Sequence, residues 1–214
     1  MTWSGPRRGY HHGNLREALV QAAVTLIGQH GPAGFSVAEA ARLAGVSPRA
    51  PYRHFRDAAA LLAEVARQGF ERFADMLARA WNDGAPDPLR AFEALGRAYL
   101  GFARTEAAYY AAMFETRLVA EGHPGLQAAG DRAFGVLRAA TERLIAGLPE
   151  GRRPPALMVA LHIWSMAHGI ASLFCRPDRS RRKLPMAAEE LLEAGLLIYL
   201  QSLGLAGGGS ATRR

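Results

Sequence analysis

The chain has 214 residues, of which 50% are hydrophobic and 21% are charged, and its formal net charge is +7. This length and apolar content can bury a core in one large domain, or in a small domain joined to a larger one. A chain this basic favours an anionic partner: nucleic acid, an anionic membrane surface or an acidic protein.

The periodicity of apolar residues predicts about nine helices and no strand, and therefore an all-α fold. The first helix is expected over 15–29, where Leu15, Leu19 and Leu26 recur at helical spacing. The next two helices are short, and a long fourth helix is expected from a cap at Asp57 to about Trp81. The remaining helices are expected over 89–104, within 105–118, and over 126–145, 156–174 and 186–203.

The two short helices have strong start signals. Ser36 and Glu39 have the spacing of a capping box, and Gly45 supplies a tight turn after that helix. Ser47 is expected to cap the second short helix with Pro48 at its first position. This helix is expected to end near 55 in spite of the proline at 51, with the aliphatic side chain at 43 in the head core.

Two short helices joined by a glycine turn are typical of a helix-turn-helix, whose second helix enters the DNA major groove. A helix in a groove needs side chains that reach phosphates and base edges, and Arg49, Tyr52, Arg53 and His54 supply them. Residues 1–57 hold seven arginines against three acidic residues, so +4 of the net charge lies there. An ordinary helix hairpin with a solvated basic face is the alternative.

The segment YHHGNLREALVQAAVTLIGQHGPAGFSVAEAARLAGVSPRAPYRHFRDAAALL, over 10–62, resembles the N-terminal domain of the TetR-type transcriptional regulators. The segment WSMAHG, over 164–169, resembles the Trp-His-Gly motif of one C-terminal subgroup. The resemblance implies an all-helical, two-fold dimeric repressor that leaves its operator when a small molecule binds the C-terminal domain. It implies a DNA-binding domain over 10–57, with the motif at about 36–55, and a ligand-binding and dimerisation domain over 58–204. The Gly-rich residues 205–214 are expected to form a disordered tail.

The resemblance also assigns DNA contacts by position. The recognition helix corresponds to 47–54, and the start of the supporting helix is expected against phosphate. Many relatives carry a lysine where this chain has Ala58, and Arg56 is the candidate to replace its phosphate contact. The predicted contacts with double-stranded DNA are Ser36, Val37, Ser47, Pro48, Arg49, Ala50, Tyr52, Arg53, His54 and Arg56.

The helix expected over 156–174 contains no charged residue and is almost long enough to span a membrane. Its histidines, serines and flanking arginines favour a buried interface helix instead, with no membrane contact. The resemblance places homodimerisation on 156–174 and 186–203, where Leu191, Leu192, Leu196 and Ile198 are expected to form the apolar face. A two-fold dimer matches a pseudo-palindromic operator.

A set of aromatic and methionine side chains in the C-terminal part could line a cavity for a small apolar ligand, or could simply pack in the core. For His168, a satisfied buried histidine is the competing interpretation. The predicted ligand-binding residues are Phe73, Met76, Phe92, Tyr99, Tyr109, Met113, Phe114, Trp164 and His168.

No catalytic, metal or cofactor site is predicted. His11 and His12 are adjacent and lack the spacing of metal ligands, and a single cysteine forms neither an intrachain disulfide nor a thiolate zinc site. The lone cysteine and the absence of a signal-peptide pattern favour the cytoplasm. The sequence therefore predicts a dimeric DNA-binding repressor released by a small, largely apolar ligand. A DNA-binding protein without an effector is the alternative, and an all-α enzyme is disfavoured.

Overall fold

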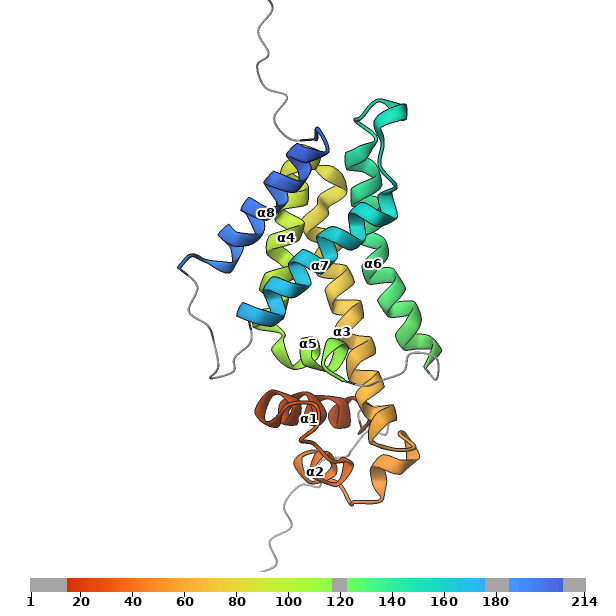
Figure 1. The fold of residues 1–214 in the computed structure, drawn as a ribbon. Helices are drawn as coiled ribbons and strands as arrows, with labels where there is room; N and C mark the ends of the chain where they lie inside the picture. Colours follow the sequence, from red (N-terminus) through yellow and green to blue (C-terminus); the bar gives the residue numbers. More distant parts are fainter. Residues whose placement is uncertain (1–14, 117–122, 176–184, 206–214) are drawn as a thin grey trace, which may run out of the picture.

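A computed structural model describes residues 15–116, 123–175 and 185–205, and within these ranges every regular element is helical. Figure 1 shows a small head at one end of the molecule and a larger helical body at the other. The predicted all-α fold class is confirmed. The eight α-helices of the described part are close to the nine expected, and the recognition helix accounts for the difference. The predicted tail, over 206–214, lies outside these ranges.

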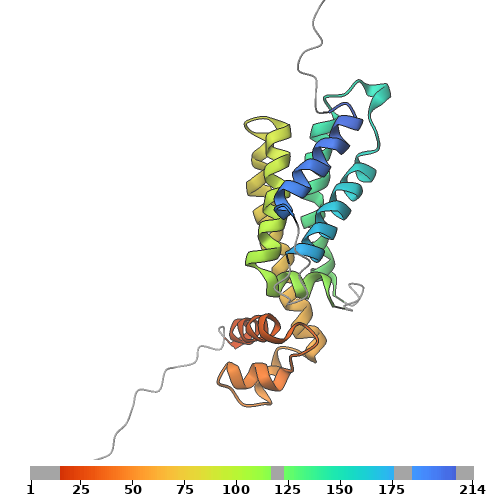
Figure 2. The same cartoon turned by 60° about the vertical axis from the view of Figure 1, so that its left-hand side comes forward.

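The head contains α1 (Leu15–His30), α2 (Val37–Leu43) and a short 3-10 helix, η1 (Ala50–Arg53), and α3 (Ala58–Trp81) leads from it into the body. The body contains α4, α5, α6, α7 and α8, and Figure 2 shows α7 and α8 side by side. Two further 3-10 turns, η2 (Asn82–Gly84) and η4 (Glu150–Arg152), lie in its connections. The body helices are α4 (Pro88–Thr105), α5 (Ala107–Phe114), α6 (Pro124–Ile145), α7 (Ala156–Phe174) and α8 (Ala188–Ser202).

The helix starts in the head follow local chemistry. At the start of α2, the Glu39 amide donates to Ser36 Oγ and the Glu39 carboxylate accepts from the Ser36 amide, so the predicted capping box is confirmed. Gly45 makes the turn with a φ of +70°, a conformation that glycine adopts without strain. At the start of α3, Asp57 accepts from the Ala60 amide over 2.8 Å, as its predicted role as the cap requires.

The prediction of an α-helix over 47–54 is wrong, because the structure has only the single 3-10 turn of η1 there. Pro51 has no N–H with which to donate to the Ser47 carbonyl, so the first α-helical hydrogen bond cannot form. The Ala50 amide donates to that carbonyl instead, over 3.0 Å, which is a 3-10 hydrogen bond. The predicted cap is also wrong, since Arg49 occupies the N-cap of η1 and makes no side-chain capping bond.

The head core is formed by α1, α2 and Phe55, two residues after η1. Leu19 and Val20 of α1 are fully buried, and Phe55 is 3% exposed. Leu43, which was expected in this core, is 52% exposed because it ends α2 on the outer side. The short elements of the head contain few apolar residues, and they are therefore held in place mainly by packing on α1.

In the body, α3 packs against α4, α5 and α6, and α7 packs against α4, α6 and α8. Close approaches occur at glycines. A Cβ on Gly69 of α3 would lie 2.8 Å from the sulfur of Met113 of α5, and one on Gly96 of α4 would lie 3.2 Å from Leu192 of α8. Leu192 and Leu196 consequently point into the monomer core rather than outward.

An ion-pair cluster around one buried carboxylate joins the head to α3. Glu64 of α3 is 7% exposed and accepts from Arg16 of α1 over 2.8 Å and from Arg67 over 2.7 Å. Burial alone raises the pKa of Glu64, but the hydrogen bonds from Arg67 and Arg16 outweigh it and lower the pKa from 4.5 to about 2. The Arg16 guanidinium also lies 5.2 Å from the centre of the Phe55 ring. Glu64 of α3 is thus connected through Arg16 to α1 and to Phe55 of the head.

Glu64→Gln should lower the free energy of unfolding by about 1–2 kcal/mol at pH 7, because two charge-assisted hydrogen bonds weaken and both arginines are partly exposed. The ionised carboxylate contributes its stability above pH 4.5 and loses it as the pH falls toward about 2, so the difference should shrink over that range. Denaturant unfolding at fixed protein concentration measures it. Glu142→Gln, in the exposed Arg138–Glu142 pair, is the control and should change stability little.

Candidate nucleic-acid interface and ligand cavity

The segment 47–54 forms an exposed edge of the head. Ser47, Pro48, Arg49, Arg53 and His54 are exposed, and Tyr52 is 58% exposed. Ala50 is half-buried, while Pro51 is fully buried and anchors the segment on the head core. Neither Arg49 nor Arg53 forms an ion pair with another of the described residues, so both guanidinium groups are available to phosphates or base edges.

The other predicted DNA contacts differ in what they can present. Ser36 is exposed, but its hydroxyl is engaged in the capping box, and the side chain of Val37 is 6% exposed inside the head. Arg56 is 82% exposed and forms an ion pair with Asp57 over 2.9 Å. The hydrogen bond from the Ala60 amide is the main cause that lowers the pKa of Asp57, and the hydrogen bond from Arg56 lowers it further. Arg56 therefore lies beside the exposed Ala58, but its charge is partly compensated by a neighbouring carboxylate.

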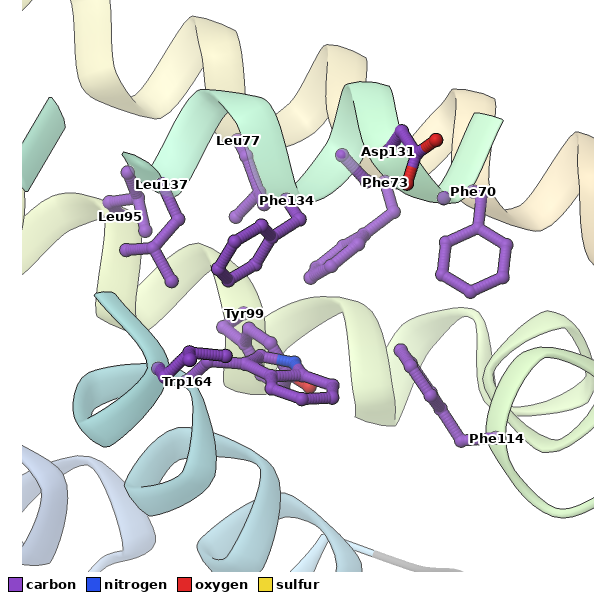
Figure 3. Close-up of a pocket in the computed structure, with 13 residues that line it drawn as sticks. Phe70, Phe73, Leu77, Leu95, Tyr99, Phe114, Asp131, Phe134, Leu137 and Trp164 are labelled. Carbon is purple, nitrogen blue, oxygen red and sulfur yellow. The ribbon is translucent and has the colours of Figure 1, made fainter. Parts of the chain in front are cut away.

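An apolar cavity of about 340 Å³ lies in the body between α3, α4, α5, α6 and α7. Figure 3 shows aromatic rings on several sides of it. Phe73 and Tyr99 meet edge to face at 5.0 Å between ring centres, and Phe70 meets Phe114 in the same way at 5.4 Å. Such a space can hold a flat or flexible apolar molecule. Its lining consists of Phe70, Phe73, Leu77, Leu95, Tyr99, Phe114, Gly130, Asp131, Ala133, Phe134, Leu137, Leu161 and Trp164.

The structure brings four of the predicted ligand residues to this cavity: Phe73, Tyr99, Phe114 and Trp164. The others lie elsewhere. Phe92 is 1% exposed behind the wall, beside Leu192 and Leu196, and Tyr109 faces α1, with its ring 4.7 Å from Arg72 and its hydroxyl 3.4 Å from Gln21. Met113 packs on Gly69, and Met76 is partly buried outside the lining.

The cavity wall that α6 contributes was not predicted from the sequence. Gly130, Phe134 and Leu137 follow one another at helical spacing. Phe134 points toward Trp164 of α7, with 6.2 Å between the ring centres (Figure 3). This stripe is visible in the sequence, but a stripe predicts burial and not whether the buried face borders a cavity. Phe70, one turn before Phe73 on α3, was missed for the same reason.

His168 lies behind the cavity wall in a polar cluster. Its Nδ1 lies 3.0 Å from Tyr99 Oη and 2.9 Å from Tyr110 Oη, and its Nε2 lies 3.4 Å from Ser172 Oγ. Burial lowers the pKa of His168, so the neutral ring accepts from a tyrosine hydroxyl at Nδ1. Burial also raises the pKa of both tyrosines. The cluster ties α4, α5 and α7 together, which is the satisfied-histidine interpretation.

Exposed apolar side chains gather on α7 and α8. Leu157 and Leu173 of α7 are 53% and 64% exposed, and Ile198 of α8 is 69% exposed. The expected apolar face of α8 is therefore partly wrong, since Leu192 and Leu196 are buried and Leu197 and Ile198 are outside. By length and composition alone α7 could cross a membrane, with a mean hydropathy of 1.5, and a third of that stretch is buried in the monomer.

An all-helical chain with a helix-turn-helix head on a larger helical body has the architecture of a DNA-binding regulator. A family profile described as bacterial regulatory proteins, tetR family, matches residues 19–65. A second profile, of the tetracyclin repressor-like C-terminal domain, matches residues 92–197. The two matches together span well over half of the sequence, and the chain belongs to the TetR family of transcriptional regulators.

Solved structures agree with this assignment. A protein of unknown function from Rhodococcus sp. RHA1 is 29% identical, with a TM-score of 0.75 over 92% of this chain and 98% of that one. The TetR family regulator PfmR from Thermus thermophilus is 23% identical, with a TM-score of 0.65 over 90% of this chain and 99% of that one. The fatty acid degradation regulator FadR from Bacillus halodurans is 17% identical, with a TM-score of 0.68 over 96% of this chain and all of that one. At these identities the last two show the fold alone, and a search among curated protein sequences finds no match.

Among the described residues, no group of three or more His, Cys, Asp or Glu side chains is placed to hold a metal ion. His11 and His12 lie outside the described residues. Cys175 is buried at the end of α7. Two features of the described part of the molecule remain as candidate binding sites: the exposed edge of the head and the apolar cavity of the body.

Ala133→Phe should fill part of the cavity and reduce binding of a neutral apolar probe, N-phenyl-1-naphthylamine, by about tenfold or more. Ala133 is 3% exposed and lines the cavity, so the added ring has no other place to go. The rise in probe fluorescence on titration measures binding. Ala139→Phe, on the exposed side of the same helix, is the control, and equal binding by both variants would place the probe elsewhere.

Proposed function

We propose that this chain is a dimeric transcriptional repressor that binds a pseudo-palindromic operator and leaves it when a small, largely apolar ligand enters the cavity bounded by α3, α4, α5, α6 and α7. The observation that carries the proposal is the course of α3. It starts three residues after Phe55 of the head and supplies Phe70, Phe73 and Leu77 to the cavity wall. One helix thus connects the DNA-facing segment with the ligand space.

The DNA-binding part rests on the exposed segment 47–54. Arg49, Tyr52, Arg53 and His54 are directed to solvent on the head, and Pro51 fixes the segment from below. Arg49 is the residue to which we assign base reading, because an arginine can donate two hydrogen bonds to a guanine edge. Arg53 and Arg56 are assigned to phosphates, and the predicted contacts of Ser36 and Val37 are assigned to their backbone.

The dimer part rests on the exposed apolar side chains of α7 and α8. Burying these exposed side chains against a second copy of the chain removes them from water. The same argument favours an interface role for α7 over a membrane span, since α7 already packs on three helices of the body. The resemblance of residues 164–169 to the Trp-His-Gly motif supports the proposed C-terminal subgroup.

Release by ligand follows from two states that differ in how the head sits on α3. A ligand shifts the balance between them only by its different affinity for each. A molecule pressed against Phe70 and Phe73 acts on the helix that continues into the head. Release of the operator by neutral apolar compounds tests this part of the proposal. If compounds that bind in the cavity do not release the operator, the protein is a DNA-binding protein without an effector.

Arg49→Ala should weaken operator binding by about 1–3 kcal/mol and relax the preference at one base position. The operator is the pseudo-palindrome recovered by selection from a random duplex pool, and competition between duplexes that differ at one position measures the preference. Arg90→Ala removes the same charge from an arginine in the body that is 76% exposed, and serves as the control. Equal loss for all sequences would make Arg49 a phosphate contact.

Ile198→Glu should dissociate the dimer, because an unpaired carboxylate in an apolar interface has to be desolvated or protonated. Sedimentation velocity over a range of protein concentrations measures the change. Leu43→Glu replaces an exposed aliphatic side chain of the head and should leave the dimer intact. An Ile198→Glu protein that sediments as the unchanged dimer would move the interface off this face of α8.

A further inference from the structure

The cavity is lined asymmetrically with respect to charge. Six of its lining residues are aromatic, and they come from α3, α4, α5, α6 and α7. Asp131 of α6 is the one acidic side chain among the lining residues, and none of them is an arginine, lysine or histidine. Asp131 is also exposed, which places its carboxylate where the cavity meets solvent. Figure 3 shows it at one end of the cavity beside Phe70 and Phe73.

The hydroxyl group of Tyr99 in the lining already has a partner, because it lies 3.0 Å from His168 Nδ1. No buried polar side-chain atom of the described residues lacks a hydrogen bond. The buried polar groups that a ligand meets in this cavity therefore already have hydrogen-bond partners. A polar group of the ligand is best placed at Asp131.

We propose that the cavity selects lipophilic cations: molecules with an apolar, preferably aromatic body and a protonated amine or quaternary ammonium group that lies at Asp131. The cation gains from the carboxylate and from the faces of the surrounding rings, which attract positive charge. This inference rests on the proposed function, since it names the class of ligand for the same cavity.

An anionic ligand is disfavoured by the same geometry. A carboxylate or phosphate at the mouth would approach the Asp131 charge, and no cationic side chain of the described lining would compensate it. Arg132, the sequence neighbour of Asp131, is bound to Asp75 of α3, so its charge is already paired. The positive net charge of the whole chain acts at longer range, where about 0.15 M salt screens it beyond roughly 8 Å.

Three naphthalene compounds of matched shape test the inference: 2-(2-naphthyl)ethylamine, 2-(2-naphthyl)ethanol and 2-naphthylacetate. They carry a positive charge, no charge and a negative charge at pH 7. Isothermal titration of the full chain should show the amine binding about tenfold or more tightly than the acetate, with the alcohol between them. Asp131→Asn should bring the amine and the acetate to within about twofold of each other.

Glu142→Gln is the matched control, since it removes the same charge from an exposed position on the same helix, outside the lining. It should preserve the preference for the amine. Asp131 is exposed, so Asp131→Asn should fold normally, and circular dichroism with thermal unfolding checks this. The inference is overturned if the acetate binds as tightly as the amine, if the amine does not bind, or if Asp131→Asn leaves the preference unchanged.

Release of the selected operator by the same compounds separates this inference from the proposed function. Asp131-dependent binding of the amine without release supports the cation preference and contradicts ligand-controlled repression. Release by the acetate or the alcohol at concentrations equal to those of the amine supports ligand-controlled repression and contradicts the cation preference.

Discussion

The carboxylate of Glu64 is the contact on which the arrangement of head and body depends. It is nearly buried, and an isolated charge in that place would be costly, so Arg16 and Arg67 have to remain bound to it. Arg16 belongs to α1 and also covers the ring of Phe55, which directly follows the exposed segment 47–54. One cluster therefore holds α1 on α3 and supports the segment from the inside.

The cavity lies on the same helix, a short way along its axis. Phe70 and Phe73 follow Glu64 by six and nine residues, which corresponds to roughly 9–14 Å in an α-helix. A second connection runs through α5, where Phe114 lines the cavity and Tyr109 faces α1. Both routes use packed helices, which move as bodies between discrete arrangements rather than deforming continuously. The fold thus places the cavity against α3 and α5, which are both in contact with α1 of the head.

The features predictable from sequence were those decided within a few residues. The capping box at Ser36 and Glu39 and the cap at Asp57 depend on neighbouring amides alone, and helix boundaries followed from them. The 3-10 turn at Pro51 was not predicted, although the loss of one backbone hydrogen bond matters more in a helix this short. It was harder to predict which neighbouring helix a given apolar side chain contacts. Phe92 and Phe73 look alike in sequence, and Leu192 and Ile198 share one amphipathic stretch, yet they face different neighbours because α4, α3 and α8 are each packed on more than one side. Residue type and spacing indicate that a side chain is buried, but only the packed fold determines against what.

Trp164 has an optical consequence. The chain has three tryptophans, at positions 3, 81 and 164. Trp81 lies at the far end of α3 against Gly84, whereas the indole of Trp164 forms part of the cavity wall. Indole emission depends on the polarity around the ring, so a molecule that displaces solvent beside Trp164 changes the colour and the yield of its fluorescence. The protein therefore carries an intrinsic reporter at the wall of its own cavity, and occupancy can be followed without a label and without DNA.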